Sequence, residues 1–163
     1  MNSDKKDREL LIKQQYICFS LNKEEYCMDI LKVQEIKGWS DVREIPNTPS
    51  YVKGVMNLRN IVVPIIDLRV KFGNLNVDYG ATTVVIIVSV VENSRNHSVG
   101  IVVDSVSDVL DLLPDQINKA PNLGMSIDTR YIRGMVEVNK EMVMVIDMDK
   151  LLDMEELINL SEK

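Results

Sequence analysis

The sequence predicts an all-β protein built from two small, similar barrels with a groove between them. Apolar residues make up 45% of the 163 residues but aromatic residues only 5%, and valine, isoleucine and leucine dominate the apolar set. Short apolar runs alternate with polar turns, which is typical of strands joined in hairpins. In addition, the stretch YVKGVMNLRNIVVPIIDL (51–68) returns eighty positions later as YIRGMVEVNKEMVMVIDM (131–148).

The first half of the chain carries the pattern of two hairpins. Residues 1–13 are charge-rich, and we expect a frayed or weakly helical arm there. YICFSL and EEYCMDI flank the polar turn NKE and predict a hairpin, which VQEIKGW follows as a further strand. Thr48 as N-cap and Pro49 predict a short helical turn that closes at Gly54. VMNL, IVVPIIDL and TTVVIIVSVV follow as strands, and Pro64 places its strand at an edge or at a bulge.

The second half continues in the same manner. HSVGIVVDSVSDVL predicts a strand, or a strand broken by a bend, and LPDQINKAPNLG predicts a loop with a possible turn of helix. GMVEV and EMVMVIDM predict a hairpin around the polar segment NK. DKLLDMEELI has its apolar residues on one helical face, so we expect a C-terminal helix that covers an open face of the sheet structure. Residues 154–163 would form the end of this helix and a tail.

The repeat divides the predicted strands into two sets. A second match, with an offset of 73, relates YCMDILKVQEI (26–36) to VGIVVDSVSDV (99–109). Each copy therefore holds a leading hairpin, a turn ending in glycine and a closing hairpin. Five short strands close most easily as a small barrel, and a groove between two barrels is a common place for a ligand. We expect the matched glycines, Gly54 and Gly134, to hold a left-handed or tightly turned backbone.

Composition and charge argue against several function classes. The net charge of −6 disfavours nucleic acids and anionic membranes as partners. No apolar run approaches a membrane span, and the N-terminus has no signal-peptide core, so we expect a cytoplasmic protein. Asp67 and Asp147 are repeat mates and raise the idea of an aspartic-protease dyad. They end hydrophobic strands, however, and we expect them to bind turn amides instead.

The remaining reactive residues do not form a catalytic set. Cys18 and Cys27 lie in strands of one hairpin and, depending on the turn, could face each other across it. We expect reduced core or surface thiols there, as is usual in a cytosolic protein. A metal site would need more ligands nearby, and none are written there. His97 lies in the polar stretch ENSRNH and is expected in a loop, without the geometry to activate a cysteine. The sequence therefore predicts a protein that binds rather than reacts, without metal or cofactor.

Four stretches together resemble the CheW-like domain family: FSLNKEEYCMDILKVQEI, IPNTPSYVKGVMNLRNIVVPIIDLR, GIVVDSVSDVL and YIRGMVEVNKEMVMVIDMDKLL. The resemblance covers residues 14–153. Members of this family are adaptors that couple the chemotaxis histidine kinase CheA to methyl-accepting chemoreceptors. The resemblance implies two intertwined five-stranded SH3-like barrels, no enzymatic activity and no cofactor. It implies two partners, the regulatory domain of CheA and the cytoplasmic signalling tip of a receptor, and a location at the inner face of the membrane through receptor arrays.

The resemblance also assigns site residues by position. The DIxxVxEI strand and the VDxV motif supply the apolar residues of a receptor-binding groove: Ile30, Val33, Ile36 and Val106. Glu35 and Arg59 are linked to receptor coupling, and they could pair with each other or with the receptor. Spacing alone favours a core position for the four apolar residues, and only the resemblance assigns them to a groove. The two charges could be an ordinary surface pair.

Kinase contact is placed by resemblance at an exposed end of the first barrel, around Val42 and Ile45. The chain departs from the family at Asn60, where the motif NLRG usually ends in glycine. Asparagine is the best non-glycine residue for positive φ, so we expect this turn to survive.

Two alternatives stay open at this point. The chain could be the CheW-like part of a CheV-type protein or of the kinase itself. A small-barrel enzyme or nucleic-acid-binding protein is disfavoured by the missing catalytic groups, the negative charge and the few aromatic residues for stacking.

Overall fold

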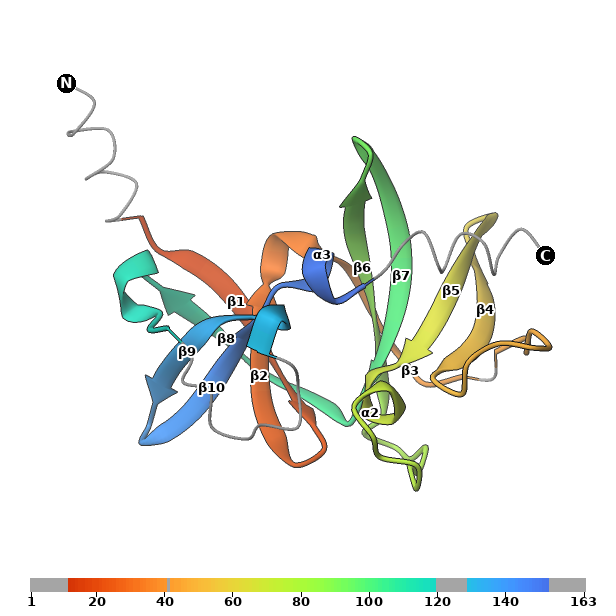
Figure 1. Ribbon diagram of the computed structural model, residues 1–163, viewed down its shortest axis with the longest axis horizontal. Helices are drawn as coiled ribbons and strands as arrows, with labels where there is room; N and C mark the ends of the chain where they lie inside the picture. Colours follow the sequence, from red (N-terminus) through yellow and green to blue (C-terminus); the bar gives the residue numbers. More distant parts are fainter. Residues whose placement is uncertain (1–11, 41, 120–128, 153–163) are drawn as a thin grey trace.

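The computed structural model describes residues 12–40, 42–119 and 129–152, and its strands form two five-stranded sheets (Figure 1). The strands are β1 (Gln14–Leu21), β2 (Glu24–Asp29), β3 (Val33–Gly38), β4 (Val52–Leu58), β5 (Ile61–Asp67), β6 (Val84–Glu92), β7 (Arg95–Val103), β8 (Ser105–Leu112), β9 (Ile132–Val138) and β10 (Glu141–Ile146). Short helical turns connect them: η1 (Ile30–Lys32), α2 (Leu68–Lys71), η2 (Pro114–Gln116), η3 (Thr129–Tyr131) and α3 (Met148–Leu151). Most of the predicted N-terminal arm and the end of the predicted C-terminal helix lie outside the described residues.

Each sheet forms one small barrel. Barrel I has the strand order β3-β6-β7-β5-β4, and barrel II has the order β8-β1-β2-β10-β9. Neighbouring strands are antiparallel except at two places, where β5 pairs with β7 and β10 pairs with β2 in parallel. In Figure 1 the two barrels lie side by side, with β6 and β7 of barrel I next to β1 and β2 of barrel II.

The structure confirms the repeat. The five strands of one copy are expected from the sequence to close as one barrel, but neither copy forms a barrel by itself. The leading hairpin of the first copy, β1–β2, pairs with the closing hairpin of the second copy, β9–β10. The leading hairpin of the second copy, β6–β7, pairs in the same way with β4–β5. Equivalent hairpins have equivalent apolar patterns, so the sequence shows which strands correspond but not which copy each one joins. The barrels are therefore intertwined, in agreement with the family resemblance.

Three apolar clusters hold this arrangement together. One fills barrel II and includes Tyr16, Leu112 and Val143, and a second fills barrel I and includes Val63 and Val85. The largest lies between the barrels. It combines β1–β2 side chains with β6–β7 side chains and with residues from both closing hairpins: Ile17, Phe19, Leu21, Tyr26, Met28, Val52, Ile66, Leu68, Ile86, Val88, Val90, Val99, Ile101, Val103, Ile132, Met144, Ile146, Met148, Leu151 and Leu152. We call this the shared core. Because it draws on both copies, each barrel needs the other to bury its apolar surface.

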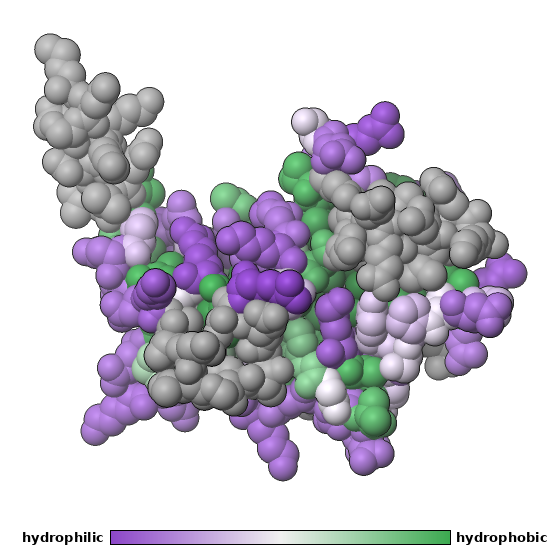
Figure 2. Space-filling view, viewed as in Figure 1, coloured by the Kyte–Doolittle hydropathy of each residue, from purple (hydrophilic) through white to green (hydrophobic). Residues whose placement is uncertain are grey.

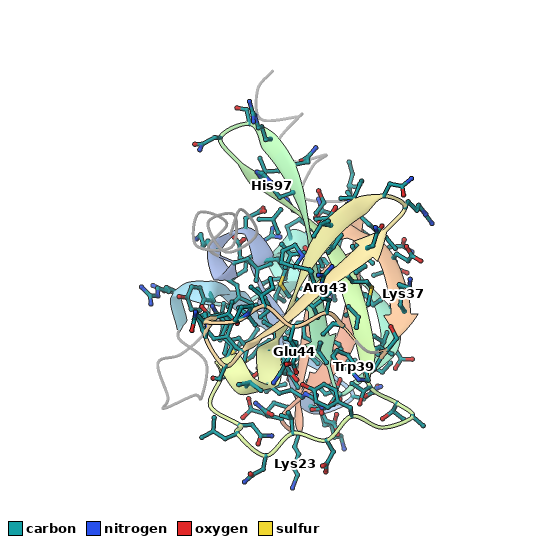
Figure 3. The ribbon with its side chains drawn as sticks, turned by 90° about the vertical axis from the view of Figure 1, so that its right-hand side faces the viewer. Lys23, Lys37, Trp39, Arg43, Glu44 and His97 are labelled. Carbon is teal, nitrogen blue, oxygen red and sulfur yellow. The ribbon has the colours of Figure 1, made fainter. Side chains whose placement is uncertain are left out.

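Most predicted strands and hairpins are confirmed. Of the two forms expected for HSVGIVVDSVSDVL, the broken strand is correct, because Asp104 separates β7 from β8. Two local expectations, at Thr48 and His97, are wrong. No helix forms at Thr48; its hydroxyl donates to the carbonyl of Ile45 at 3.0 Å, which stabilises a turn instead. His97 lies in β7 opposite Val90 rather than in a loop, because the turn of this hairpin uses only residues 93–94. Figure 3 shows His97 on this projecting hairpin.

The matched glycines lie inside strands, not at the end of a turn. Gly54 in β4 has φ +144° and lies against the backbone of Arg43, while Gly134 in β9 has no such φ. A Cβ on Gly134 would lie 2.6 Å from the carbonyl oxygen of Asn118. Segments around Arg43 and Asn118 form single bridges to β4 and β9 at these points. Both glycines are therefore required by close backbone approach, which covers the open edge of each barrel.

Candidate functional site

The apolar residues predicted to bind a partner border the shared core. Ile30 and Val33 are half-buried and pack against it from η1 and the start of β3. Asp29 caps η1, since its Oδ1 accepts a hydrogen bond from the Leu31 amide at 2.9 Å. This turn leaves Leu31 84% exposed beside them. The local sequence thus holds three apolar residues at the surface where the chain crosses from barrel II to barrel I.

Ile36 extends this apolar surface along β3. It lies opposite Ile86, and Val33 lies opposite Val88; both partners belong to the shared core. Directly opposite residues in a sheet share one face, so Val33 and Ile36 face the junction between the barrels. Ile36 is 42% exposed. Figure 2 shows apolar residues gathered along the middle of one face of the molecule, over β6 and β7, with more hydrophilic residues on barrel II.

Val106 borders the same core at a different level. It is half-buried in β8 opposite Phe19, near the turn of the β1–β2 hairpin. Ile30, in contrast, follows Asp29 at the other end of that hairpin, where Asp29 lies opposite Tyr16. Phe19 and Tyr16 are three residues apart in β1, which corresponds to about 10 Å along a strand. The structure therefore places Val106 toward one end of the junction and Ile30 and Val33 toward the other.

Glu35 and Arg59 do pair with each other, on the barrel I side of β3. The Arg59 Nη2 to Glu35 Oε2 distance is 3.7 Å, and the side chains are 82% and 30% exposed, respectively. Arg59 and Asn60 form the β4–β5 turn with φ of +51° and +68°, and the Asn60 amide donates to Asn57 Oδ1 at 3.0 Å. A long, exposed ion pair contributes little to stability, so either side chain is available to a partner.

Val42 and Ile45 lie in the segment that covers the edge of β4. Arg43 in this segment exchanges two backbone hydrogen bonds with Val55, of 3.0 and 2.8 Å. Val42 and Ile45 are both half-buried, and Val42 packs with Trp39 against the core of barrel I. Figure 3, which faces barrel I, shows Trp39, Arg43 and Glu44 on this side. The structure therefore does not bring the two residues to the junction that Val33 and Ile36 face.

Sequence reasoning missed an ion pair beside Ile30 and Val33. Lys32 Nζ lies 2.7 Å from Asp149 Oδ2, and Asp149 Oδ1 accepts the Val91 amide at 3.1 Å. Asp149 thus connects η1, α3 and β6, next to a cavity of about 220 Å³. Lys32 and Asp149 are far apart in the chain, and no local pattern predicts their contact.

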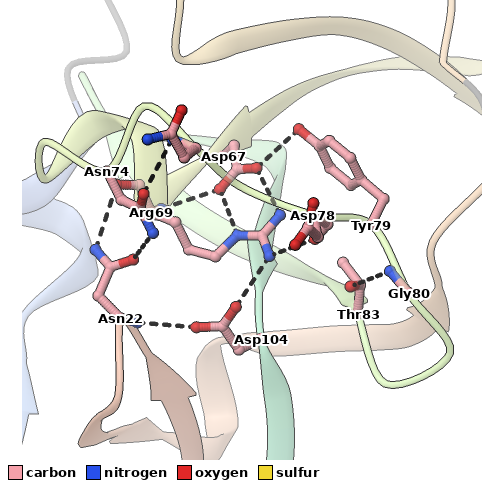
Figure 4. A network of polar contacts seen from close by, with 10 residues as sticks. Asn22, Asp67, Arg69, Asn74, Asp78, Tyr79, Gly80, Thr83 and Asp104 are labelled. Atoms are coloured by element: carbon pink, nitrogen blue, oxygen red, sulfur yellow. Dashed lines mark hydrogen bonds and ion pairs between the residues drawn. The ribbon is translucent and has the colours of Figure 1, made fainter.

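A second polar network joins the barrels from the turn of the β1–β2 hairpin (Figure 4). Arg69 Nη2 lies 2.9 Å from Asp67 Oδ2, and Arg69 Nη1 lies 2.9 Å from Asp104 Oδ1. Asp104 also accepts the Asn22 amide at 2.8 Å, which ties barrel II to α2. Burial disfavours the charged guanidinium, but hydrogen bonds to both carboxylates outweigh it and raise the pKa of Arg69. Burial and a hydrogen bond to Asp67 raise the pKa of Tyr79.

The repeated aspartates bind turn amides, as expected. Asp67 Oδ1 accepts the Arg69 amide at 3.0 Å, and Asp147 Oδ1 accepts the Lys150 amide at 3.2 Å. They cap α2 and α3 in different barrels. Within the described ranges, no group of three or more His, Cys, Asp or Glu side chains is arranged to hold a metal ion. No helix in that part of the chain is long and apolar enough to cross a membrane.

Two small barrels with one shared core, and half-exposed apolar residues where they meet, define a double-barrel interaction module. The family model of the CheW-like domain matches residues 15–156, and the chain belongs to this family. It is 47% identical over 146 residues to the chemotaxis protein CheW of Klebsiella aerogenes, covering 90% of this chain and 86% of that protein. A probable chemotaxis protein CheW of Rhizobium etli is 35% identical, over 89% of this chain and 87% of that one.

A solved structure shows the same fold. The scaffolding protein TtCheW from Thermoanaerobacter tengcongensis matches with a TM-score of 0.77 at 28% identity, covering 87% of this chain and 89% of that chain. Family, relatives and fold together make this chain a coupling scaffold of bacterial chemotaxis signalling.

Proposed function

We propose that this chain couples two proteins by binding each on a different surface, and catalyses no reaction itself. One partner is the cytoplasmic signalling tip of a methyl-accepting chemoreceptor, bound at the junction of the barrels. The other is the regulatory domain of the histidine kinase CheA, bound around Val42 and Ile45 on barrel I. Residues 14–153 form the domain that carries both surfaces. The protein then resides in the cytoplasm, at the inner face of the membrane through its receptors.

The observation that carries the receptor assignment is the exposure of apolar residues beside a core that could have buried them. Val33 and Ile36 share one face of β3, and Ile36 is 42% exposed there. An amphipathic helix docks its apolar face into a surface of this kind. A helical tip that also reaches Val106 has to run along the junction, and about seven helical residues span the 10 Å or so that separate the two levels.

The charges beside this surface favour selectivity over affinity. Arg59 is mostly exposed and only loosely paired with Glu35, at 3.7 Å. A partner with an acidic group can take over Arg59 at small cost, whereas a partner with a basic group there meets repulsion. Glu35 and Arg59 are therefore proposed to select the receptor and fix its register.

The experiment is a pair of substitutions with opposite effects. Val33→Glu should abolish binding of a receptor signalling fragment and leave binding of the CheA regulatory domain intact, because it puts a charge into the apolar junction. Ile45→Glu should do the reverse. Val109→Glu is a matched control, since Val109 is also a strand valine but is 50% exposed on barrel II.

Isothermal titration of the chain into the CheA regulatory domain and into the receptor fragment measures both interactions. Saturable one-to-one binding to each, lost separately in the two variants, is the expected result. Normal receptor binding by folded Val33→Glu would contradict the junction assignment. No binding of either partner by the unsubstituted chain would contradict the proposed function as a whole.

A further inference from the structure

The two cysteines face each other across the β1–β2 hairpin. Cys18 and Cys27 are direct partners in the antiparallel register, and they are 5% and 0% exposed. The turn has two residues, 22–23, so Leu21 and Glu24 form the hydrogen-bonded pair beside it, and the two kinds of pair alternate from there. Cys18 and Cys27 therefore occupy a non-hydrogen-bonded pair. At such a pair the Cα atoms are about 4.5 Å apart and the side chains are closest.

This placement suits a disulfide. Disulfides need a Cα separation of about 4.4–6.8 Å, with Cβ atoms directed toward each other. Cys18 and Cys27 meet this condition as they stand in the sheet, with both side chains in the core of barrel II. The thiols are free in the structure, and a bond between them would require no change of register.

The two thiols differ in access. Cys18 lines a cavity of about 210 Å³ that is open on one side, together with Ser107 and Glu141. The pairing of β1 with β8 is also irregular at Cys18, whose carbonyl accepts a long hydrogen bond, of 3.5 Å, from the Ser107 hydroxyl. Cys27 is enclosed on both sides, because β2 pairs there with β1 and with Val145 of β10. A small reagent can therefore reach Cys18 first.

The sulfur atoms also differ in chemistry. A hydrogen bond with Cys27 lowers the pKa of Cys18, although burial and the nearby Glu25 and Asp108 carboxylates oppose this shift. The same hydrogen bond raises the pKa of Cys27. Burial raises the pKa of Cys27 further. The thiolate is the nucleophilic form of cysteine, so the accessible sulfur is also the more reactive one. Cys18 has the properties of an attacking thiol, and Cys27 those of a resolving thiol.

We propose that Cys18 and Cys27 form a reversible redox site that a small, uncharged peroxide oxidises to a disulfide. The Cys18 thiolate attacks one peroxide oxygen and the O–O bond breaks, leaving a sulfenic acid on Cys18 and hydroxide, which takes up the proton that Cys18 released. The Cys27 sulfur then attacks the Cys18 sulfur, the S–O bond breaks, and the Cys27 proton leaves with the hydroxyl as water. The two thiols lose two electrons and two protons, and hydrogen peroxide becomes two waters.

Charge at the cavity selects the oxidant. Glu25, Asp108 and Glu141 all line it. Burial, followed by the proximity of Glu141 and Asp108, raises the pKa of Glu25. Carboxylates gathered around one opening repel anionic reagents such as glutathione disulfide, whereas an uncharged peroxide enters without this penalty.

The first experiment oxidises the folded 163-residue chain with hydrogen peroxide, blocks remaining thiols with N-ethylmaleimide and maps the peptides by mass spectrometry. The expected product has lost two hydrogens, carries no maleimide, contains a Cys18–Cys27 cross-linked peptide and reverts with dithiothreitol. Met142 is 50% exposed and serves as an internal control, because its sulfoxide should appear only after the disulfide. Sulfoxide on Met142 while both thiols remain free, or a disulfide between two chains, would overturn the proposal.

Two variants test the order of events. In Cys27→Ser, peroxide should leave a sulfenic acid on Cys18 that dimedone traps. In Cys18→Ser, Cys27 should remain reduced under the same conditions. Rapid oxidation of Cys27 in the second variant would overturn the assignment of Cys18 as the attacking thiol. If either variant fails to fold, the peptide map of the unsubstituted chain still decides whether the disulfide forms.

A comparison of two aromatic disulfide reagents tests the role of charge. Uncharged dithiodipyridine should react with Cys18 several-fold faster, relative to a free thiol, than the dianionic reagent of Ellman. Glu141→Gln should raise the rate with the dianion several-fold and leave the rate with dithiodipyridine unchanged. Equal relative rates for both reagents would overturn the selection by charge.

Discussion

Arg69 carries a charge into the protein interior, where it is 2% exposed and faces Asp67, which is fully buried. Its guanidinium also donates to Asp104 Oδ1 and to the carbonyl of Asp78, both at 2.9 Å. Tyr79 completes the shell with a 2.9 Å hydrogen bond to Asp67 Oδ2. Arg69 and Asp67 are both buried and neutralise each other, so loss of either one leaves the other as an unpaired buried charge.

Arg69→Met is expected to destabilise the protein by about 3–5 kcal/mol, because it leaves the buried carboxylate of Asp67 without a partner. Urea unfolding followed by circular dichroism and by the fluorescence of the single tryptophan, Trp39, measures the loss. Arg59→Met is the control, since Arg59 is exposed and its removal should cost less than about 1 kcal/mol. Similar losses for the two variants would show that the buried network is not needed for stability.

The surroundings of Glu25 disfavour its charged form, whereas those of Arg69 stabilise the charge of the guanidinium. Burial and the neighbouring Glu141 and Asp108 carboxylates raise its pKa, so folding favours the protonated acid. A pKa that is higher in the folded protein contributes stability at pH values below the pKa in the unfolded chain, which is about 4.3 for glutamate. This contribution is lost as the pH rises through the pKa in the folded protein. Glu25 therefore weakens the fold at neutral pH.

Glu25→Gln should accordingly stabilise the protein at pH 7, by no more than about 1 kcal/mol for a half-buried charge. The gain should vanish near pH 3, where Glu25 is protonated in both states. Thermal unfolding at the two pH values measures it, with Glu137→Gln at an exposed position of β9 as control. A gain of equal size at both pH values would show that charge is not its cause.

At the scale of elements, the hairpin turns are uniform. Each is a two-residue turn in which both residues have positive φ although none is glycine: Asn22–Lys23, Arg59–Asn60, Asn93–Ser94 and Asn139–Lys140. Such turns match the twist of the strands but are strained for residues other than glycine, asparagine and aspartate. The strain is therefore concentrated on the lysine, arginine and serine of these turns.

Lys140→Gly should stabilise the protein by up to about 1 kcal/mol, since it removes left-handed strain that exceeds the entropy cost of glycine. Glu141→Gly, one residue later in β10, should destabilise it, because a strand position gains nothing from that freedom. Urea midpoints of the two variants measure both effects. A loss of stability in Lys140→Gly would mean that the lysine side chain makes a contact worth more than the strain.

The sequence predicts features that depend on residues close together in the chain, but not those that depend on residues far apart in it. Strands and turns depend on neighbouring residues, and so local patterns alone predict YICFSL and EEYCMDI as strands and the segment NK as a turn. The need for glycine at position 134 depends on Asn118, which approaches from another part of the chain. The Lys32–Asp149 pair beside the candidate site likewise joins two distant segments. Such contacts form only in the folded chain, so local sequence patterns do not predict them.

At the scale of the whole molecule, the two copies of the repeat exchange their leading hairpins. Lys32 of the first copy pairs with Asp149 of the second, and Arg69 of the first with Asp104 of the second. The shared core takes side chains from both copies as well. The repeat is thus a unit of sequence, whereas the barrel, which mixes two copies, is the unit of structure.

This exchange predicts how the chain behaves when it is divided. Fragments 1–81 and 82–163 separate the two copies in an exposed loop, and neither contains a complete barrel. Each fragment alone should lack cooperative unfolding, because half of its core partners are missing. An equimolar mixture should recover a cooperative transition, and half-buried Trp39 should again stack on Tyr79, with ring centroids 4.3 Å apart.

Fragment 30–104 provides the matched control, because it holds all five strands of barrel I. It should unfold cooperatively by itself, although less stably than the whole chain, since the shared core is then open to water. Circular dichroism and Trp39 fluorescence in urea compare the fragments directly. Cooperative unfolding of 1–81 alone would contradict the exchange and restore the simpler arrangement in which each copy of the repeat closes its own barrel.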